Sequence, residues 1–197
     1  RGPRSLLLAG GAVVLAAIVV GILLFLPGGD EGPVGPFKTR PLTSNVGVED
    51  GASWSPDGSF VAYVSDRSGN PDIWVSDVRG GEALRLTEDP AADHSPAWLP
   101  DGSAIVFVSH RGGVSALWKA PRLGGSATHV LDDATDPALS PDGSRVAFAR
   151  PGPSGYHRIA VTPLASPGDV RVLTGEDDGL WDHREPAWST DGREIAY

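Results

Sequence analysis

The chain has 197 residues, with 25 Asp and Glu against 16 Lys and Arg and a formal net charge of -9 at pH 7. It contains no cysteine, which excludes disulfides, thiol nucleophiles and cysteine-ligated metal sites. The acidic balance argues against a nucleic-acid-binding surface, which needs basic side chains to displace counterions from phosphates. Because the sequence begins at Arg1 and has no methionine, we expect it to be part of a longer protein.

The first element in chain order is an uncharged apolar segment at residues 5–26, SLLLAGGAVVLAAIVVGILLFL. As a helix it would rise roughly 33 Å, enough to cross a hydrocarbon core of ~30 Å. A buried core helix would have about 10–14 apolar residues and a polar stripe. A cleaved secretory signal is the stronger alternative, but its apolar region usually has about 15 residues and ends at a small-residue cleavage site, whereas the segment 5–26 is longer. The segment therefore predicts a transmembrane helix.

Flanking charges predict how this helix is oriented. Arg1 and Arg4 lie in the N-terminal flank, residues 1–4, and the first charges after the helix are acidic. The positive-inside rule places the flank in the cytoplasm and the rest of the chain outside. Residues 27–41 hold four Pro and four Gly without a hydrophobic period, which indicates a flexible linker. We predict a single-pass protein of the inner (cytoplasmic) membrane.

A short motif repeats through the remaining residues, 42–197, at spacings of 44, 41 and 49 residues. Its four copies are Trp54–Gly58, Trp98–Gly102, Leu139–Gly143 and Trp188–Gly192. The core of the motif is Pro-Asp-Gly, in which Pro fixes φ near -65°, Asp caps the local backbone and Gly accepts a positive φ. Each copy therefore predicts a tight turn between two strands.

Short apolar runs of strand type follow each motif. They lie at 60–64, 72–75 and 83–86, at 104–108, 116–119 and 128–131, at 145–149, 158–161 and 170–173, and at 193–197. Four strands per unit of roughly 40–45 residues, with no helical pattern, are typical of a β-propeller blade. We predict an all-β chain of such blades. Packing of one blade on the next should bury the tryptophans Trp54, Trp74, Trp98, Trp118 and Trp188.

The first unit, WSPDGSFVAYVSDRSGNPDIWV followed by GGEALRLT, resembles the TolB-type β-propeller repeat, and the resemblance covers about residues 41–197. It implies a six-bladed propeller. Residues 40–44 resemble the outer strand of a preceding blade, so we expect about three and a half blades here. We expect an open stack of this kind to aggregate or to be only marginally stable by itself. Departures from the repeat at Leu99, Leu139 and Thr190 should weaken single turns.

Motifs for catalysis or cofactor binding are missing from the sequence. It has no Gly-x-Ser-x-Gly nucleophile elbow, no phosphate-binding glycine loop, no His-Glu-x-x-His pair and no Asp-rich calcium loop. We therefore expect no catalytic residue, no metal and no cofactor in these residues. His110, His129 and His157 occur singly and are expected to be surface residues.

Acidic and histidine residues precede the first strand of each unit. In a propeller these residues lead into the strands that line the central channel, so their side chains would converge around one mouth. Our hypothesis is a negatively charged channel rim that binds a cationic peptide segment or a cation. The alternative is that these polar side chains cap turns in solvent. The candidate rim residues are Asp50, Asp93, His94, Asp136, His183 and Glu185.

The order of segments resembles bacterial membrane proteins in which a serine/threonine kinase or a winged-helix regulator precedes the anchor and TolB-type repeats follow it. We predict a membrane-anchored sensor or interaction module that binds a protein or ligand outside the cytoplasm and does not contact nucleic acid. The alternatives are the propeller of a membrane-anchored prolyl-oligopeptidase-like serine peptidase and a periplasmic TolB-like protein. No kinase, winged-helix or peptidase motif occurs in the chain, so the sequence leaves open whether the whole protein is an enzyme.

Overall fold

The computed structural model describes residues 39–44, 47–175 and 181–197. The predicted spanning helix at 5–26, its flank and most of the linker lie outside these residues. Within the part of the chain that the structure describes, no helix has the length and apolar character needed to cross a membrane. The described residues from Pro41 onward belong to one structural unit.

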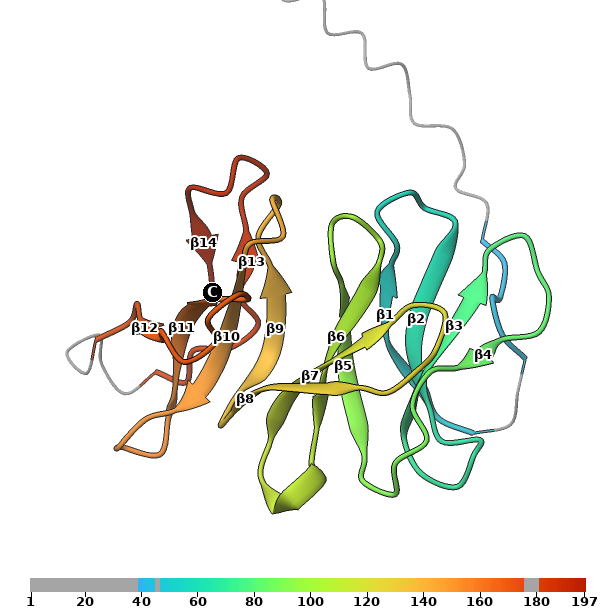
Figure 1. Cartoon of the computed structure of the whole chain (residues 1–197), viewed down its shortest axis with the longest axis horizontal. Coiled ribbons are helices and arrows are strands. Elements are labelled where there is room, and N and C mark those ends of the chain that lie inside the picture. Colours follow the sequence, from blue (N-terminus) through green and yellow to red (C-terminus); the bar gives the residue numbers. More distant parts are fainter. Residues whose placement is uncertain (1–38, 45–46, 176–180) are drawn as a thin grey trace, which may run out of the picture. The chain divides into compact units, whose positions relative to one another are not determined.

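Three four-stranded antiparallel sheets and one two-stranded sheet follow one another along the chain (Figure 1). Their strands are β1 (Glu49–Trp54), β2 (Phe60–Ser65), β3 (Asp72–Asp77), β4 (Leu84–Arg85), β5 (Asp93–Trp98), β6 (Ala104–Ser109), β7 (Ala116–Pro121), β8 (Thr128–Asp132), β9 (Thr135–Leu139), β10 (Arg145–Pro151), β11 (His157–Pro163), β12 (Arg171–Val172), β13 (Ala187–Trp188) and β14 (Ile195–Ala196). A 3₁₀ turn, η1 (Arg111–Gly113), precedes β7. The predicted all-β chain of four-stranded units is confirmed.

The outer strands β4 and β12 have only two residues each, shorter than the apolar runs predicted there. Threonine side chains continue the pairing beyond both strands. The Thr87 hydroxyl accepts a hydrogen bond from the Ile73 N–H at 2.9 Å, and Thr174 accepts one from the Ile159 N–H at 3.1 Å. A side chain thus takes the place of a backbone carbonyl, which ends the regular ladder early. Residues 40–44, predicted as an outer strand, form no strand, and Thr43 donates to the Glu49 carboxylate.

Three Pro-Asp-Gly turns and the matching turn at Thr190 join the first and second strands of each sheet, and all four lie at the same end of the sheets, the top of Figure 1. In the first turn the Ser55 hydroxyl donates to Asp57 Oδ1 at 2.6 Å, and the Ser59 N–H donates to the same oxygen at 3.0 Å. Gly58 has φ of 67°, which a residue with a Cβ adopts only at a cost. The turn chemistry predicted from the sequence is confirmed.

In each of the three four-stranded sheets, the first strand carries a β-bulge. Pairing with the second strand shifts register between Asp50 and Ser53 in β1 and between His94 and Ala97 in β5. A residue three positions before the motif has a φ of 50–58° in all four units, namely Gly51, Ser95, Asp136 and Glu185. A bulge lifts one residue out of the ladder and re-aims the side chains beside it. The side chains at the beginning of a bulged first strand therefore point differently from those in its regular part.

Consecutive sheets pack through their first strands, because β1 contacts β5, β5 contacts β9 and β9 contacts β13. Two apolar cores fill the junctions. Ile73 and Val75 share one core with Phe107, and Leu117 shares the other with Phe148. Phe107 and Phe148 are fully buried, and each such side chain contributes about 1.5–3 kcal/mol through removal from water. The neighbouring first strands bring residues far apart in the sequence to one place.

Tryptophans of the motif link neighbouring sheets. The indole Nε1 of Trp98 donates to the Ser53 carbonyl at 3.0 Å, and that of Trp188 donates to the Ala138 carbonyl at 3.0 Å. Leu139 has no indole N–H, so this departure from the repeat removes a hydrogen bond at a junction. We had predicted that it would weaken a turn. The prediction that Trp54 packs between blades is wrong, because its side chain is 63 % exposed and no described sheet precedes β1.

Candidate functional site

The beginnings of the first strands lie at the end of the sheets opposite the Pro-Asp-Gly turns. The residues three and four positions before each copy of the motif form what we call the mouth: Asp50 and Gly51, His94 and Ser95, Thr135 and Asp136, and Arg184 and Glu185. Asp50 and Glu185 are exposed and Asp136 is half-buried. Since β1, β5, β9 and β13 are consecutive neighbours, three sheets contribute a carboxylate to one row.

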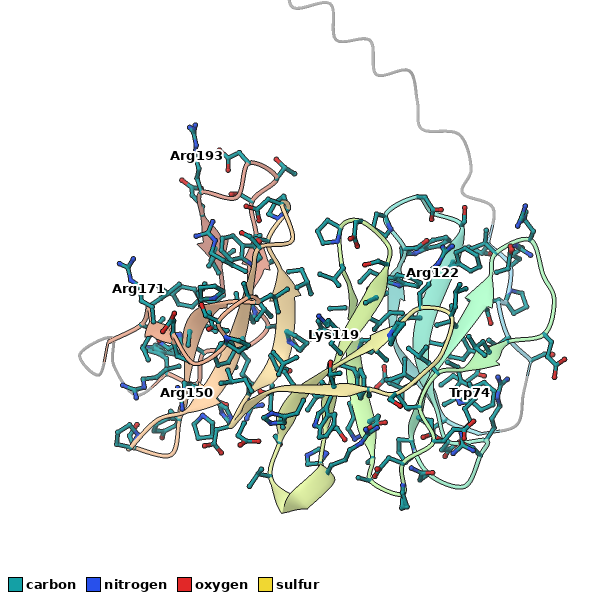
Figure 2. All side chains as sticks on the ribbon, viewed as in Figure 1. Trp74, Lys119, Arg122, Arg150, Arg171 and Arg193 are labelled. Atoms are coloured by element: carbon teal, nitrogen blue, oxygen red, sulfur yellow. The ribbon has the colours of Figure 1, made fainter. Side chains whose placement is uncertain are left out.

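The carboxylate of Asp50 is bordered by a cavity of about 310 Å³. Its lining is Leu42, Thr43, Glu49, Asp50, Gly51, Ala52, Val61 and Tyr63. Two basic side chains of the last two sheets lie elsewhere: Arg171 belongs to the outermost strand, β12, and Arg193 lies at the hairpin end (Figure 2). The surface around Asp50 therefore offers a cationic group both a charge and a recess.

Asp93, which we predicted at the rim, is fully buried. Its Oδ2 receives a hydrogen bond from Arg111 Nη2 at 3.0 Å, and the Arg111 guanidinium lies 4.7 Å from the ring centroid of Trp118. Burial raises the pKa of Asp93. The placement at the rim is wrong, because the carboxylate is the buried partner of an ion pair inside the second sheet.

The same three positions change together along the repeat. In the first sheet they are Glu49, Arg67 and Trp74, in the second Asp93, Arg111 and Trp118, and in the third Ala134, Gly152 and Ala160. In the first sheet the guanidinium again covers the indole, 3.4 Å from its centroid. The third sheet loses acid, arginine and indole at once. This joint replacement is the signal in the sequence that would have identified Asp93 as structural.

His94 is half-buried, and its ring meets that of His110 edge-on with centroids 5.6 Å apart. His110 Nε2 lies 3.1 Å from the Ser115 hydroxyl. Burial, and next the neighbouring His110, lower the pKa of His94, so its ring is neutral at pH 7. His110, which we predicted to stand alone on the surface, is joined to the mouth through His94.

Arg184 is a cation in the mouth that the sequence analysis missed. Its Nε donates to Asp182 Oδ2 at 2.8 Å, and its Nη1 lies 4.0 Å from Asp136 Oδ2. His157 Nδ1 lies 2.8 Å from the other oxygen of Asp182, so His157 is not isolated either. Arg184, together with hydrogen bonds from His157, holds the pKa of Asp182 well below its usual range. Arg184 thereby offsets part of the negative charge near Asp136.

His183, the remaining predicted residue, packs edge-on against the ring of Tyr197 with centroids 5.0 Å apart. Its backbone N–H donates to the His157 carbonyl at 3.1 Å. The structure therefore brings Asp50, His94 and Asp136 to the mouth, and Glu185 stands at the matching position of the last sheet. Among the residues that the structure describes, no three carboxylate or imidazole groups are placed to hold a metal ion.

Comparison with known proteins identifies the repeat. A family model described as the TolB beta propeller domain matches residues 38–197. The chain belongs to the TolB β-propeller family. The crystal structure of TolB from Acinetobacter baumannii superposes with a TM-score of 0.68 at 26% identity, over 79% of this chain and 39% of that one. A putative TolB from Agrobacterium tumefaciens gives 0.64 at 28% identity, over 73% and 55%.

Among curated proteins, a TolB homolog from Chlorobium luteolum is 41% identical over 44 residues, which is 22% of this chain and 10% of that protein. The chain thus spans only part of the TolB proteins that it matches. A puromycin-hydrolyzing peptidase from Mycobacterium tuberculosis superposes with a TM-score of 0.58 at 16% identity, over 75% of this chain and 25% of that one. This last likeness concerns the propeller fold alone.

Proposed function

We propose that this TolB-type propeller is a binding module that receives a cationic segment of a protein partner at the mouth. The observation that carries the proposal is the repetition of carboxylates three or four positions before the motif: Asp50, Asp136 and Glu185 lie there in three of the four units. Charges grouped at a cleft steer oppositely charged partners and raise their association rate. Arg184 reduces the net negative charge of the mouth without pairing with Asp50 or Glu185 in the described contacts.

The binding test neutralises the three carboxylates in the full chain as Asp50→Asn, Asp136→Asn and Glu185→Gln. Asparagine suits position 136, where φ is 52°. We expect affinity for a lysine-rich peptide to fall about tenfold or more at low salt, because three attractive charges are lost. The matched control is Glu82→Gln, Asp133→Asn and Asp169→Asn, which removes three exposed carboxylates elsewhere and also includes a positive φ, at Asp133. Equal losses in the two triple variants would reject the mouth as the binding site.

The proposal places the propeller outside the cytoplasm, held by the apolar segment 5–26. It is supported by the length of that segment, the arginines before it and the family of the propeller. In spheroplasts with an intact inner membrane, added protease should digest the propeller. Digestion only after the inner membrane is lysed would contradict this orientation. A role in signalling, with a kinase or a winged-helix regulator on the cytoplasmic side, is supported by the order of segments alone.

A further inference from the structure

Two imidazole groups lie at the mouth beside the carboxylates of the proposed binding site. His94 occupies the same bulge position in β5 that Asp50 occupies in β1, and β5 lies between β1 and β9. His110, the first residue after β6, packs edge-on against His94. The pair thus stands between the sheet of Asp50 and the sheet of Asp136.

We propose that the His94–His110 pair makes cation binding at the mouth pH-dependent, so that the mouth releases a cationic segment at mildly acidic pH. This inference rests on the proposed function and adds its regulation. Histidine is the side chain whose charge changes between pH 5 and pH 8. Two imidazolium charges among the carboxylates would cancel most of the attraction that a cation feels there.

The surroundings of His94 set the direction of the effect. Burial and then His110 lower the pKa of His94 and oppose its protonation, while Asp93 and Asp50 favour protonation more weakly. From the other elements packed against β5, β1 contributes Glu49 besides Asp50, β9 contributes Asp136, β2 and β6 contribute no charged residue, and β3 contributes Asp72 and Asp77. These last two are paired with Arg85 and Arg79. Arg111, which follows His110, is paired with Asp93. Of the carboxylates on these strands, Asp50 has no ion pair among the described contacts, and Asp136 lies 4.0 Å from Arg184 Nη1.

Protonation also changes the pair itself. His110 Nδ1 lies 3.4 Å from the Ala92 carbonyl and Nε2 lies 3.1 Å from the Ser115 hydroxyl, so both of its nitrogens have oxygen partners. When His110 is charged, an edge-on charged His94 repels it. The fall in pH therefore adds positive charge at the mouth and loosens the contact between the two rings.

The test measures binding of a fluorescein-labelled peptide of alternating lysine and glycine to the full chain in nonionic detergent, at constant ionic strength. Lysine stays charged and ordinary carboxyls stay ionised at both pH 7.5 and pH 5.5. We expect the affinity of the wild type to be about fivefold lower at pH 5.5. His94→Asn, which keeps His110, should reduce this change to about half, and His129→Asn, a histidine outside the mouth, should keep the fivefold change.

Equal affinity of the wild type at both pH values would overturn the inference, as would a full pH effect in His94→Asn. If His94→Asn does not fold, His110→Asn tests the same inference, because it should reduce the pH dependence of peptide affinity to about half. The NMR titrations of the two imidazoles should also be coupled, and independent titrations would count against the pair. Peptide binding that depends on the three carboxylates and not on pH would reject only this inference. Binding indifferent to the carboxylates would reject the proposed function.

Discussion

At the scale of single residues, one indole N–H at a junction joins a sheet to the one before it. Trp98 is 6% exposed and donates to the carbonyl of Ser53. A buried carbonyl that loses its donor costs about 1–3 kcal/mol, in addition to the cavity left by a smaller ring. The exposed Trp54 occupies the same place in the motif and has no such acceptor in the described residues.

The pair of tryptophans provides a matched experiment. Trp98→Phe should lower the free energy of unfolding by about 2 kcal/mol, because it removes the hydrogen bond and part of the packing. Trp54→Phe, the same change at an exposed site, should stay within about 0.5 kcal/mol of the wild type. Urea unfolding followed by far-UV circular dichroism measures both. Similar losses in the two variants would show that the junction does not depend on this indole.

At the scale of elements, the Pro-Asp-Gly turns of successive sheets lie against one another. A Cβ added at Gly143 would lie 3.3 Å from Cδ of Pro100 in the preceding turn, and one at Gly192 would lie 3.5 Å from Cδ of Pro141. A Cβ added at Gly58 would meet no atom within 4 Å. The turns therefore form a stack in which the proline of one turn covers the glycine of the next.

Alanine at two of these glycines separates turn strain from turn stacking. Gly58→Ala and Gly143→Ala both impose a positive φ, 67° and 70°, on a residue with a Cβ, which costs about 1–2 kcal/mol. Only Gly143→Ala also crowds the neighbouring turn, so we expect it to be the more destabilising by about 1 kcal/mol. Thermal unfolding compares the two. Equal destabilisation would mean that the turns do not support one another.

These elements were predictable from the sequence to the extent that their causes are local. Pro-Asp-Gly specifies its turn within a few residues, so the hairpins and the four-strand unit follow directly from the motif. Asp50 and Asp93 look alike in sequence, and only the packing of Arg111 beneath β5 separates an exposed carboxylate from a buried one. Arg184 was overlooked because its partner Asp136 lies 48 positions earlier and is brought near by the contact of β9 with β13.

At the scale of the whole molecule, acid should unfold the propeller through its turns. In all four turns a serine hydroxyl and a backbone N–H bind the aspartate and lower its pKa; the residues are Asp57, Asp101, Asp142 and Asp191. For Asp142 these bonds, the largest from Ser140, lower the pKa to about 2. A carboxyl with a pKa lowered by folding stabilises the fold above its unfolded value, near 3.8, and loses that contribution as the pH falls toward 2.

Asp142→Asn should therefore reduce the loss of stability between pH 4 and pH 2, and it should lower stability at pH 7, where the wild-type carboxylate is ionised. Urea midpoints at a series of pH values measure the effect. Asp169→Asn changes an exposed aspartate between β11 and β12 and serves as the control. A pH profile of Asp142→Asn that runs parallel to the wild type would contradict the assignment.

The residue with positive φ before each motif has a consequence for which side chains the mouth can carry. The residue with positive φ is lifted out of the ladder, so its side chain can vary independently of the strand pairing that holds the sheet. Glycine, serine, aspartate and glutamate occupy this position in the four units. Each sheet contributes its own residue to the mouth, and a substitution in one sheet does not require substitutions in the others. The repeat therefore combines a fixed framework with a combinatorial recognition surface.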